Sequence, residues 1–132
     1  MRVKGFIVYD MLEETRVDFD LQIDNSLATQ DKAVVDAVSF ALFGKTIFND
    51  IFAKKMVPYV ILEICDGKEN ICLVRQPEYI RTTSMGKECL RKGVFSIKIG
   101  ELEYDGLSSD KYYELLNPHL NISYEEFKSL CK

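Results

Sequence analysis

The chain has 132 residues, of which 47% are hydrophobic and 29% charged, a size and composition that suit one globular domain with a real core. Its formal net charge of −4 and pI of about 5.1 argue against a surface that binds nucleic acid everywhere, although a local basic patch is compatible with them. No apolar run reaches the roughly 18–20 residues of a membrane span, and the N-terminal segment lacks signal-peptide features. We therefore expect a cytoplasmic protein.

The first elements are predicted to be an antiparallel β-hairpin. Residues 2–9 are rich in β-branched and aromatic side chains, which favours a strand. Residues 15–23 alternate between apolar and polar side chains, which is typical of a half-buried strand. Residues 11–14 are the expected turn between these two strands.

Residues 31–43 change to a helical pattern. The segment is apolar nearly all round and is interrupted only by Asp36 and Ser39, so it predicts a helix that is buried on most of its faces. Thr29 or Asp31 can cap its start and Gly44 can end it. Asp36 is expected to make a structural polar contact rather than to act in catalysis.

Further strands are expected in the middle of the chain. Residues 57–65 and 71–76 flank an Asp-Gly turn signal and predict a second hairpin. Residues 77–92 are polar and basic. Residues 93–104 predict another strand pair, with its turn at Gly100.

Two short helices are predicted to close the chain. Ser108 or Ser109 can cap a helix that runs to Leu116 and stops at Asn117-Pro118. The capping-box pattern from Ser123 to Glu126 opens a last helix. The element order indicates an α+β fold over residues 1–132 as a single domain, with an antiparallel-rich sheet wrapped around one buried helix.

The cysteines and the single histidine do not indicate a metal site or a nucleophile. None of the cysteines forms a CxxC pair, and His119 lies far from most of them in sequence, whereas a zinc site uses closely paired ligands. His119 follows Pro118 at a predicted helix end, with no visible partner for general-base chemistry. We expect reduced thiols and no metal. The cysteines are Cys65, Cys72, Cys89 and Cys131.

Four segments carry a resemblance to a known family. They are GFIVYDMLEETRVDFD (residues 5–20), VVDAVSFALFG (34–44), LVRQPEYIR (73–81) and NPHLNISYEEFKS (117–129). In this order they resemble the first two strands, the helix after the phosphate-binding loop, the Arg-rich strand and the segment before the Q-loop of SbcC-type double-strand-break repair proteins. These are SMC-like members of the ABC ATPase superfamily. The resemblance spans essentially the whole chain and implies half of an ABC ATPase head domain.

The phosphate-binding loop of that family is degenerate here. Its pattern GxxGxGK[ST] uses glycine N–H groups and a lysine to hold phosphates and a hydroxyl to hold magnesium. The sequence instead has Asn25, Ala28 and Gln30 at the glycines, Asp31 at the lysine and Lys32 at the hydroxyl. A carboxylate at ~4 Å from a phosphate charge is repelled by roughly 1–4 kcal/mol. A shift of one residue would give Lys32 the lysine role, but would still leave no glycine. We expect no nucleotide cofactor.

The rest of the family's catalytic machinery is also missing from the sequence. The glutamine of the Q-loop, the signature motif, the Walker B strand and the coiled coil have no counterpart, so the resemblance covers only the N-terminal lobe of the head. No paired carboxylates, Cys/His couple or Ser/His constellation can be placed together from the sequence. We therefore expect a protein that is not an enzyme.

Two groups of residues are candidates for contact with a partner. The first is basic and can be a DNA contact, a solvated loop or a protein contact. The second is aromatic and lies on the last two predicted helices, where a solitary lobe must cover the surface that normally meets the second lobe. The basic group is Arg75, Arg81, Lys87, Arg91 and Lys92, and the aromatic group is Tyr112, Tyr113, Tyr124 and Phe127.

These features lead to three hypotheses of function. The first is a non-catalytic interaction protein, a pseudo-ATPase lobe that binds and regulates or inhibits an SMC-like ATPase, its nuclease, or another DNA-processing or defence complex. Such a decoy would suit a mobile element or phage. The second is a degenerate subunit of a split SMC-like ATPase whose other chain supplies the Walker B and signature motifs. The third is a scaffold repurposed to bind an unrelated protein. The expected partner is a protein of these classes or a second copy, with DNA a weaker candidate and no membrane.

Overall fold

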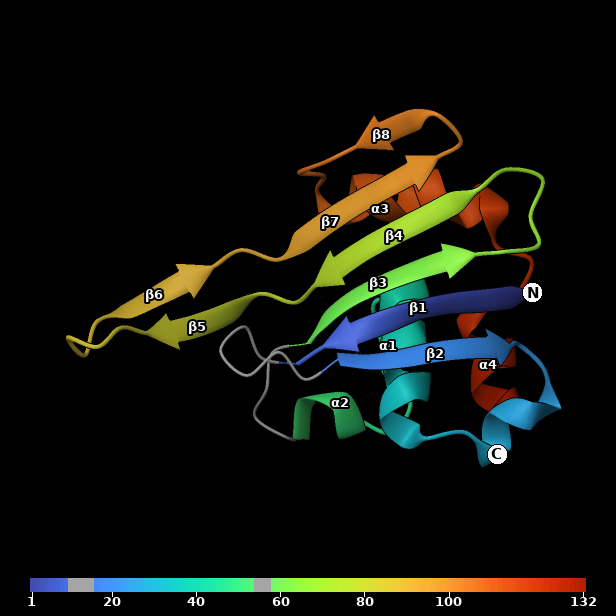
Figure 1. The fold of residues 1–132 in the computed structure, drawn as a ribbon, viewed down its shortest axis with the longest axis horizontal. Coiled ribbons are helices and arrows are strands. Elements are labelled where there is room, and N and C mark those ends of the chain that lie inside the picture. Colours follow the sequence, from blue (N-terminus) through green and yellow to red (C-terminus); the bar gives the residue numbers. More distant parts are fainter. Residues whose placement is uncertain (10–15, 54–57) are drawn as a thin grey trace.

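A computed structural model of the chain describes residues 1–9, 16–53 and 58–132 (Figure 1). Its main sheet has six strands in the order β2-β1-β3-β4-β7-β8, and every neighbouring pair is antiparallel. The predicted α+β class with an antiparallel sheet is confirmed. The strands are β1 (Arg2–Val8), β2 (Arg16–Gln22), β3 (Tyr59–Ile64), β4 (Ile71–Gln76), β7 (Val94–Ile99) and β8 (Leu102–Tyr104).

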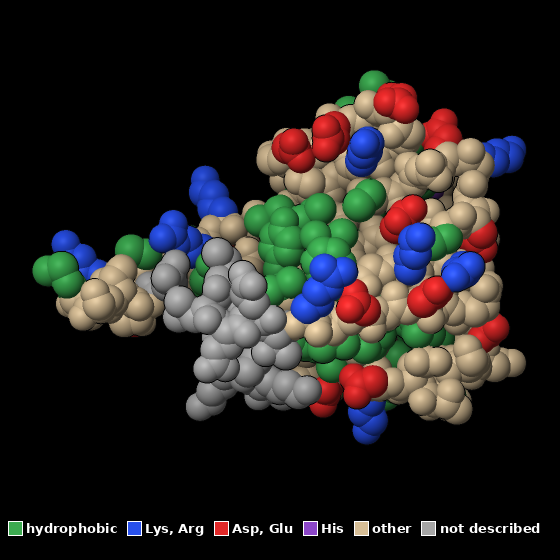
Figure 2. Space-filling view, in the orientation of Figure 1, with side chains coloured by type: hydrophobic (Ala, Val, Ile, Leu, Met, Phe, Trp, Pro, Cys, Tyr) green, Lys and Arg blue, Asp and Glu red, His purple; other side chains and the backbone are tan. Residues whose placement is uncertain are grey.

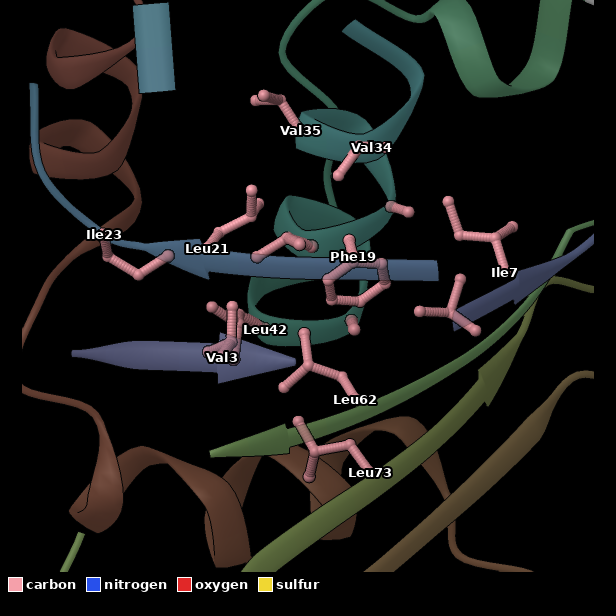
Figure 3. Close-up of a cluster of buried hydrophobic side chains, with 14 of the residues drawn as sticks. Val3, Ile7, Phe19, Leu21, Ile23, Val34, Val35, Leu42, Leu62 and Leu73 are labelled. Carbon is pink, nitrogen blue, oxygen red and sulfur yellow. The ribbon is translucent and has the colours of Figure 1, made fainter. Parts of the chain in front are cut away.

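One face of the sheet is covered by helices, and the core lies between them. In Figure 1 the helices α1, α3 and α4 lie behind the sheet, and none of the helices that the structure describes lies in front of it. Alternate residues of a strand point to opposite faces, so the buried residues Val3, Leu62 and Leu73 share the covered face. These side chains belong to one buried cluster with Val34 and Leu42 of α1, and Figure 3 shows Val3 beside Leu42.

Helix α1 (Lys32–Phe43) is the predicted buried helix, and both of its ends are capped as expected. The Asp31 side chain accepts hydrogen bonds from the N–H groups of Ala33 and Val34, at 2.9 and 3.3 Å. Gly44 ends the helix in the left-handed region at φ 75° and donates its N–H to the Phe40 carbonyl. Every residue from Ala33 to Leu42 is buried.

The C-terminal helices pack against α1 rather than lying free. Tyr112 and Leu116 of α3 (Ser109–Leu116) and Phe127 of α4 (Tyr124–Leu130) are fully buried. The Tyr112 hydroxyl donates to the carbonyl of Ala41 at 3.0 Å. The predicted caps are present, since Ser108 caps α3, and Ser123 with Glu126 forms the capping box of α4. A short 3₁₀ turn, η2 (Asn117–His119), joins the two helices.

The predicted hairpins are found where they fall within the described residues. β3 pairs with β4 across residues 65–70, and β7 pairs with β8 across Gly100, which has a φ of 58°. The expected turn at residues 11–14 lies outside the described residues. Helix α2 (Asp50–Ala53) is a single short turn. Among the helices that the structure describes, none has the length and apolar character needed to cross a bilayer.

The basic segment forms a hairpin that the sequence did not predict. β5 (Tyr79–Thr82) pairs with β6 (Glu88–Arg91) in a separate two-stranded sheet. Figure 1 shows this ribbon projecting from the end of the main sheet at which β4 ends and β7 begins. We call it the arm.

Candidate interaction surfaces

The segment that the resemblance aligns with a phosphate-binding loop is folded onto the protein's own core. Residues Asn25–Thr29 form the 3₁₀ helix η1, which Asp24 caps by accepting the Ser26 N–H at 2.8 Å. Leu27 is buried in the core and holds this turn in place. Asn25, Ala28 and Gln30 are exposed. The segment is therefore a helical turn anchored by a leucine, and not a glycine loop whose N–H groups curl around an anion.

The N-terminus of α1 is occupied by a carboxylate of the same chain. A helix N-terminus is where phosphates bind in loops of the resembled type, because its free N–H groups point outward. Here Asp31 accepts two of those N–H groups itself. Lys32 is exposed, and its ammonium lies 5.4 Å from the centre of the Phe48 ring. Neither Asp31 nor Lys32 is arranged as a phosphate ligand.

Asp36 is buried within α1 and organises the turn that follows the helix. Its carboxylate accepts the backbone N–H groups of Ile47, Phe48 and Asp50, at 2.7, 2.8 and 2.6 Å. These bonds satisfy N–H groups that precede and begin α2. The predicted structural role of Asp36 is confirmed, and its oxygens are engaged by main chain.

The predicted basic group is not one surface, because Arg75 belongs to the interior. Its side chain is 7% exposed, and its guanidinium lies 3.7 Å from the ring centre of Phe95 and 4.4 Å from that of Phe40. One nitrogen donates to the Gln76 carbonyl at 2.9 Å. The prediction that Arg75 contacts DNA or a partner is wrong, because β4 turns this residue to the covered face, where aromatic rings stack on it.

The rest of the basic group lies on the arm or at its end. Lys87, Arg91 and Lys92 are exposed, and Arg81 lies on β5 opposite Cys89. Sequence reasoning noted these charges but missed the apolar residues between them. Ile80 and Leu90 face each other across the ribbon with 64% and 61% of their surfaces exposed, and Met85 near the tip is 85% exposed. The available signal was large apolar residues isolated in a polar segment.

The aromatic group is mostly core. Tyr112 and Phe127 are fully buried, so the prediction that they form a partner surface is wrong. The physical reason is that α3 and α4 are short amphipathic helices whose large side chains pack against α1. Tyr113 and Tyr124 are partly buried, and Tyr124 donates its hydroxyl to the Thr46 carbonyl at 2.9 Å.

An apolar surface is found instead on the side of the sheet that the helices leave bare, which we call the uncovered face. Phe6 pairs with Ile61, and Ile61 pairs with Val74, so three apolar side chains cross three strands in one row. Val8 and Tyr59 form the next row. All five are partly exposed. Figure 2 looks onto this face and shows an apolar area toward the arm, with charged side chains at the opposite end.

The uncovered face is hollowed beside its edge. A shallow depression of about 340 Å³ lies over Gly5, between Phe6, Ile61 and Cys72. A side chain at Gly5 would meet the Ile61 carbonyl oxygen, since a Cβ would lie 1.9 Å from it. The Arg16 guanidinium stacks on the Phe6 ring at 3.8 Å and forms one wall. The depression combines an apolar floor with a charged rim.

Charged residues fill the other end of the uncovered face and neutralise one another. Lys4 pairs in register with Asp20 on β2 and with Glu63 on β3. Arg2 donates to Asp20 at 2.6 Å, and this contact holds the pKa of the Asp20 carboxyl below its usual range. Exposed pairs of this kind contribute little stability. They limit the apolar area to the end of the face nearest the arm.

No cluster of three or more His, Cys, Asp or Glu side chains suited to a metal ion occurs within residues 1–9, 16–53 and 58–132. All four cysteines are free thiols. Burial raises the pKa of the Cys72 thiol, and the nearby Glu63 carboxylate raises it further. A raised pKa makes a thiol a poorer nucleophile near neutral pH.

Comparison with protein-family models, curated proteins and solved structures finds no match for this chain. The interpretation of its surfaces therefore depends on the geometry described above.

Proposed function

We propose that this chain is a non-catalytic interaction protein, a degenerate ABC ATPase-like lobe that binds and regulates or inhibits an SMC-like ATPase, its nuclease, or another DNA-processing or defence complex. The observation that supports this most directly is the Asp31 carboxylate on the first N–H groups of α1. A nucleotide phosphate would need the same N–H groups and would be repelled by that charge.

The partner is proposed to be a protein because the uncovered face is apolar where the arm begins. Phe6, Ile61 and Val74 lie side by side in the strand register, on a face that none of the described helices covers (Figure 1). Apolar areas that stay open to water are typical of interaction sites. In the resembled family this lobe packs against a second lobe. An exposed apolar face that binds another protein is consistent with such an origin.

The decisive experiment is affinity capture from lysate of the native host, with the bound proteins identified by mass spectrometry. Wild-type protein is compared with Ile61→Glu, which places a charge on the uncovered face. Ala28→Glu is the matched control, because Ala28 is exposed on η1 and lies off this face. We expect an SMC-like ATPase or nuclease to be captured by the wild type and the control and to be lost with Ile61→Glu.

The captured complex then distinguishes a regulator from an enzyme subunit. Adding the purified chain to its partner should lower or redirect the partner's ATPase or nuclease activity. ATP hydrolysis that appears only on mixing would assign the chain to a split ATPase and overturn the proposal. Tight binding of an ATP analogue to the chain alone would also contradict it. Loss of capture with Ala28→Glu as well as Ile61→Glu would remove the uncovered face from the proposal.

A further inference from the structure

The arm is an amphipathic ribbon whose two faces differ. The register pairs Ile80 with Leu90 on one face, while Cys89 and Arg91 of β6 point to the other. The arm and its flanks also carry Lys87, Arg91 and Lys92, so it is basic in a chain whose formal net charge is −4. A two-stranded hairpin on its own is marginal in water, and a third strand or a packed helix is needed to stabilise it. A strand that pairs with the basic, apolar arm should therefore carry apolar and acidic side chains.

The same chain offers such a surface at the edge of its main sheet. Among the described strands β8 pairs only with β7, so its other side is a free strand edge there. Leu102 on this strand is 61% exposed. Glu101, Glu103 and Asp105 beside it are all exposed. We call residues 101–105 the β8 edge.

The exposed large hydrophobic residues concentrate on these two places. In the part of the chain that the structure describes, five such residues are exposed, and four of them lie on the arm or the β8 edge. The arm contributes Ile80, Met85 and Leu90, and the β8 edge contributes Leu102; Phe48 is the fifth. The basic charge accompanies the first group and the acidic charge the second, so the two surfaces are complementary in both respects.

We propose that the protein self-associates by docking the arm of one copy against the β8 edge of a second copy. Strand addition at a sheet edge supplies main-chain hydrogen bonds, and side chains on both sides supply specificity. Ile80 and Leu90 meet Leu102, while Arg91 and Lys87 face Glu101 and Glu103. A closed dimer with two-fold symmetry makes this contact twice and leaves no arm free. This inference does not depend on the proposed function, because neither surface belongs to the uncovered face.

The test is to measure the mass of the protein in solution by light scattering and analytical ultracentrifugation over a wide range of protein concentration. We expect wild-type protein to exceed the chain mass of 15.2 kDa and to approach twice that mass as concentration rises. Leu90→Glu and Leu102→Glu should each weaken the association by about tenfold or more, the size of effect expected for a central apolar contact. Phe48→Glu is the matched control, with the same change at the exposed hydrophobic residue outside both surfaces, and should leave the association unchanged.

A charge-swap series separates a specific contact from damage to the fold. Arg91→Glu and Glu103→Lys should each weaken the association, and the double variant should partly restore it. Higher salt should also weaken the wild-type association. Circular dichroism checks that each variant is folded.

A wild type that stays at the chain mass at every concentration would overturn the proposal. So would association that persists unchanged in both Leu90→Glu and Leu102→Glu. If the wild type is monomeric and Arg91→Glu lowers its affinity for duplex DNA, the arm's partner is nucleic acid instead. If a captured host protein depends on Leu90 while the wild type alone is monomeric, the arm's partner is that protein. Either result also rejects self-association.

Discussion

The two faces of the main sheet are built from the same strands but differ in how completely their apolar residues are buried. On β2 the alternation is complete, with Phe19 and Leu21 buried and Asp18 and Asp20 exposed. On β3 it is not, because Tyr59 and Ile61 alternate with residues that are themselves apolar. A solvated antiparallel face normally carries polar residues. The central strands therefore have the composition of a sheet that is covered on both sides, while the described helices cover only one.

Polar groups show the opposite distribution. Asp31 and Asp36 are satisfied within the chain, since they accept main-chain N–H groups in the bonds described above, whereas the buried Nε of Arg75 has no hydrogen-bond partner among the described residues. The N–H groups at the start of α1 and before α2 are thus occupied by the chain's own carboxylates. The exposed apolar side chains lie instead on the uncovered face and the arm, a distribution that is typical of a protein-binding surface rather than of an anion site.

The largest expected effect on stability comes from removing the Asp36 carboxylate. Asp36→Ala leaves three N–H groups of the turn before α2 without their acceptor. We expect the free energy of unfolding to fall by about 3–5 kcal/mol, because hydrogen bonds to a charged acceptor contribute about 1.5–3 kcal/mol each. Asp36→Asn keeps one acceptor oxygen and should lose less. Urea unfolding followed by circular dichroism measures both. Equal stability of wild type and Asp36→Ala would show that the carboxylate does not hold this turn.

Two neighbouring residues of β3 test the difference between the faces directly. Leu62→Ala removes a fully buried side chain from the covered face and should cost about 2–5 kcal/mol. Ile61→Ala, one residue away on the uncovered face, should cost less than about 1 kcal/mol and instead weaken capture of the partner. Urea unfolding gives the first quantity and affinity capture the second. A cost at Ile61 equal to that at Leu62 would mean that the uncovered face belongs to the core.

Arg75 and Arg91 allow the same substitution to be compared at a buried and at an exposed position of the predicted basic group. Arg75→Lys loses the flat stacking on Phe95 and Phe40, and we expect a cost of about 1–2 kcal/mol. Arg91→Lys keeps an exposed charge on the arm and should change stability by less than about 0.5 kcal/mol. Thermal unfolding distinguishes them. Similar shifts for the two variants would contradict the burial of Arg75.

Elements set by local chemistry could be predicted from the sequence, and those set by distant contacts could not. Asp31, Gly44 and Ser123 carry their capping signals within a few residues, and each acts as predicted. The arm was missed because its strands are short and polar residues interrupt them. Arg75 was misplaced because Phe40, Phe95 and Tyr112 come from three separate elements. The uncovered face was missed because apolar runs such as that of β3 do not reveal how many sides are covered.

A smaller effect is expected where α3 meets α1. Tyr112→Phe removes the hydrogen bond to Ala41 and should cost about 0.5–1.5 kcal/mol near neutral pH. Burial also raises the pKa of Tyr112 well above its usual value, so the fold favours the neutral phenol. That contribution is present below about pH 10, where unfolded tyrosine ionises, and is lost as pH rises further. The wild type should therefore lose more stability than Tyr112→Phe above this pH, as measured by urea unfolding. Parallel pH curves for the two proteins would contradict the burial of the hydroxyl.

The smallest effect leaves stability unchanged and reports on the uncovered face itself. Cys72 lies at the depression on that face, and its raised pKa leaves little thiolate, so alkylation near about pH 8 should be slower than for free cysteine. Burial is the main cause of the raised Cys72 pKa, and the Glu63 charge is the second. Glu63→Gln removes that charge and should speed the alkylation of Cys72. Glu69→Gln, in the exposed turn, should leave the rate unchanged. Peptide mass spectrometry separates Cys72 from the other thiols. If the proposed partner covers this face, its binding slows Cys72 alkylation and leaves Cys89 on the arm unchanged, whereas self-association through the arm protects Cys89 first. Equal protection of both thiols by the partner would show that the two surfaces act as one.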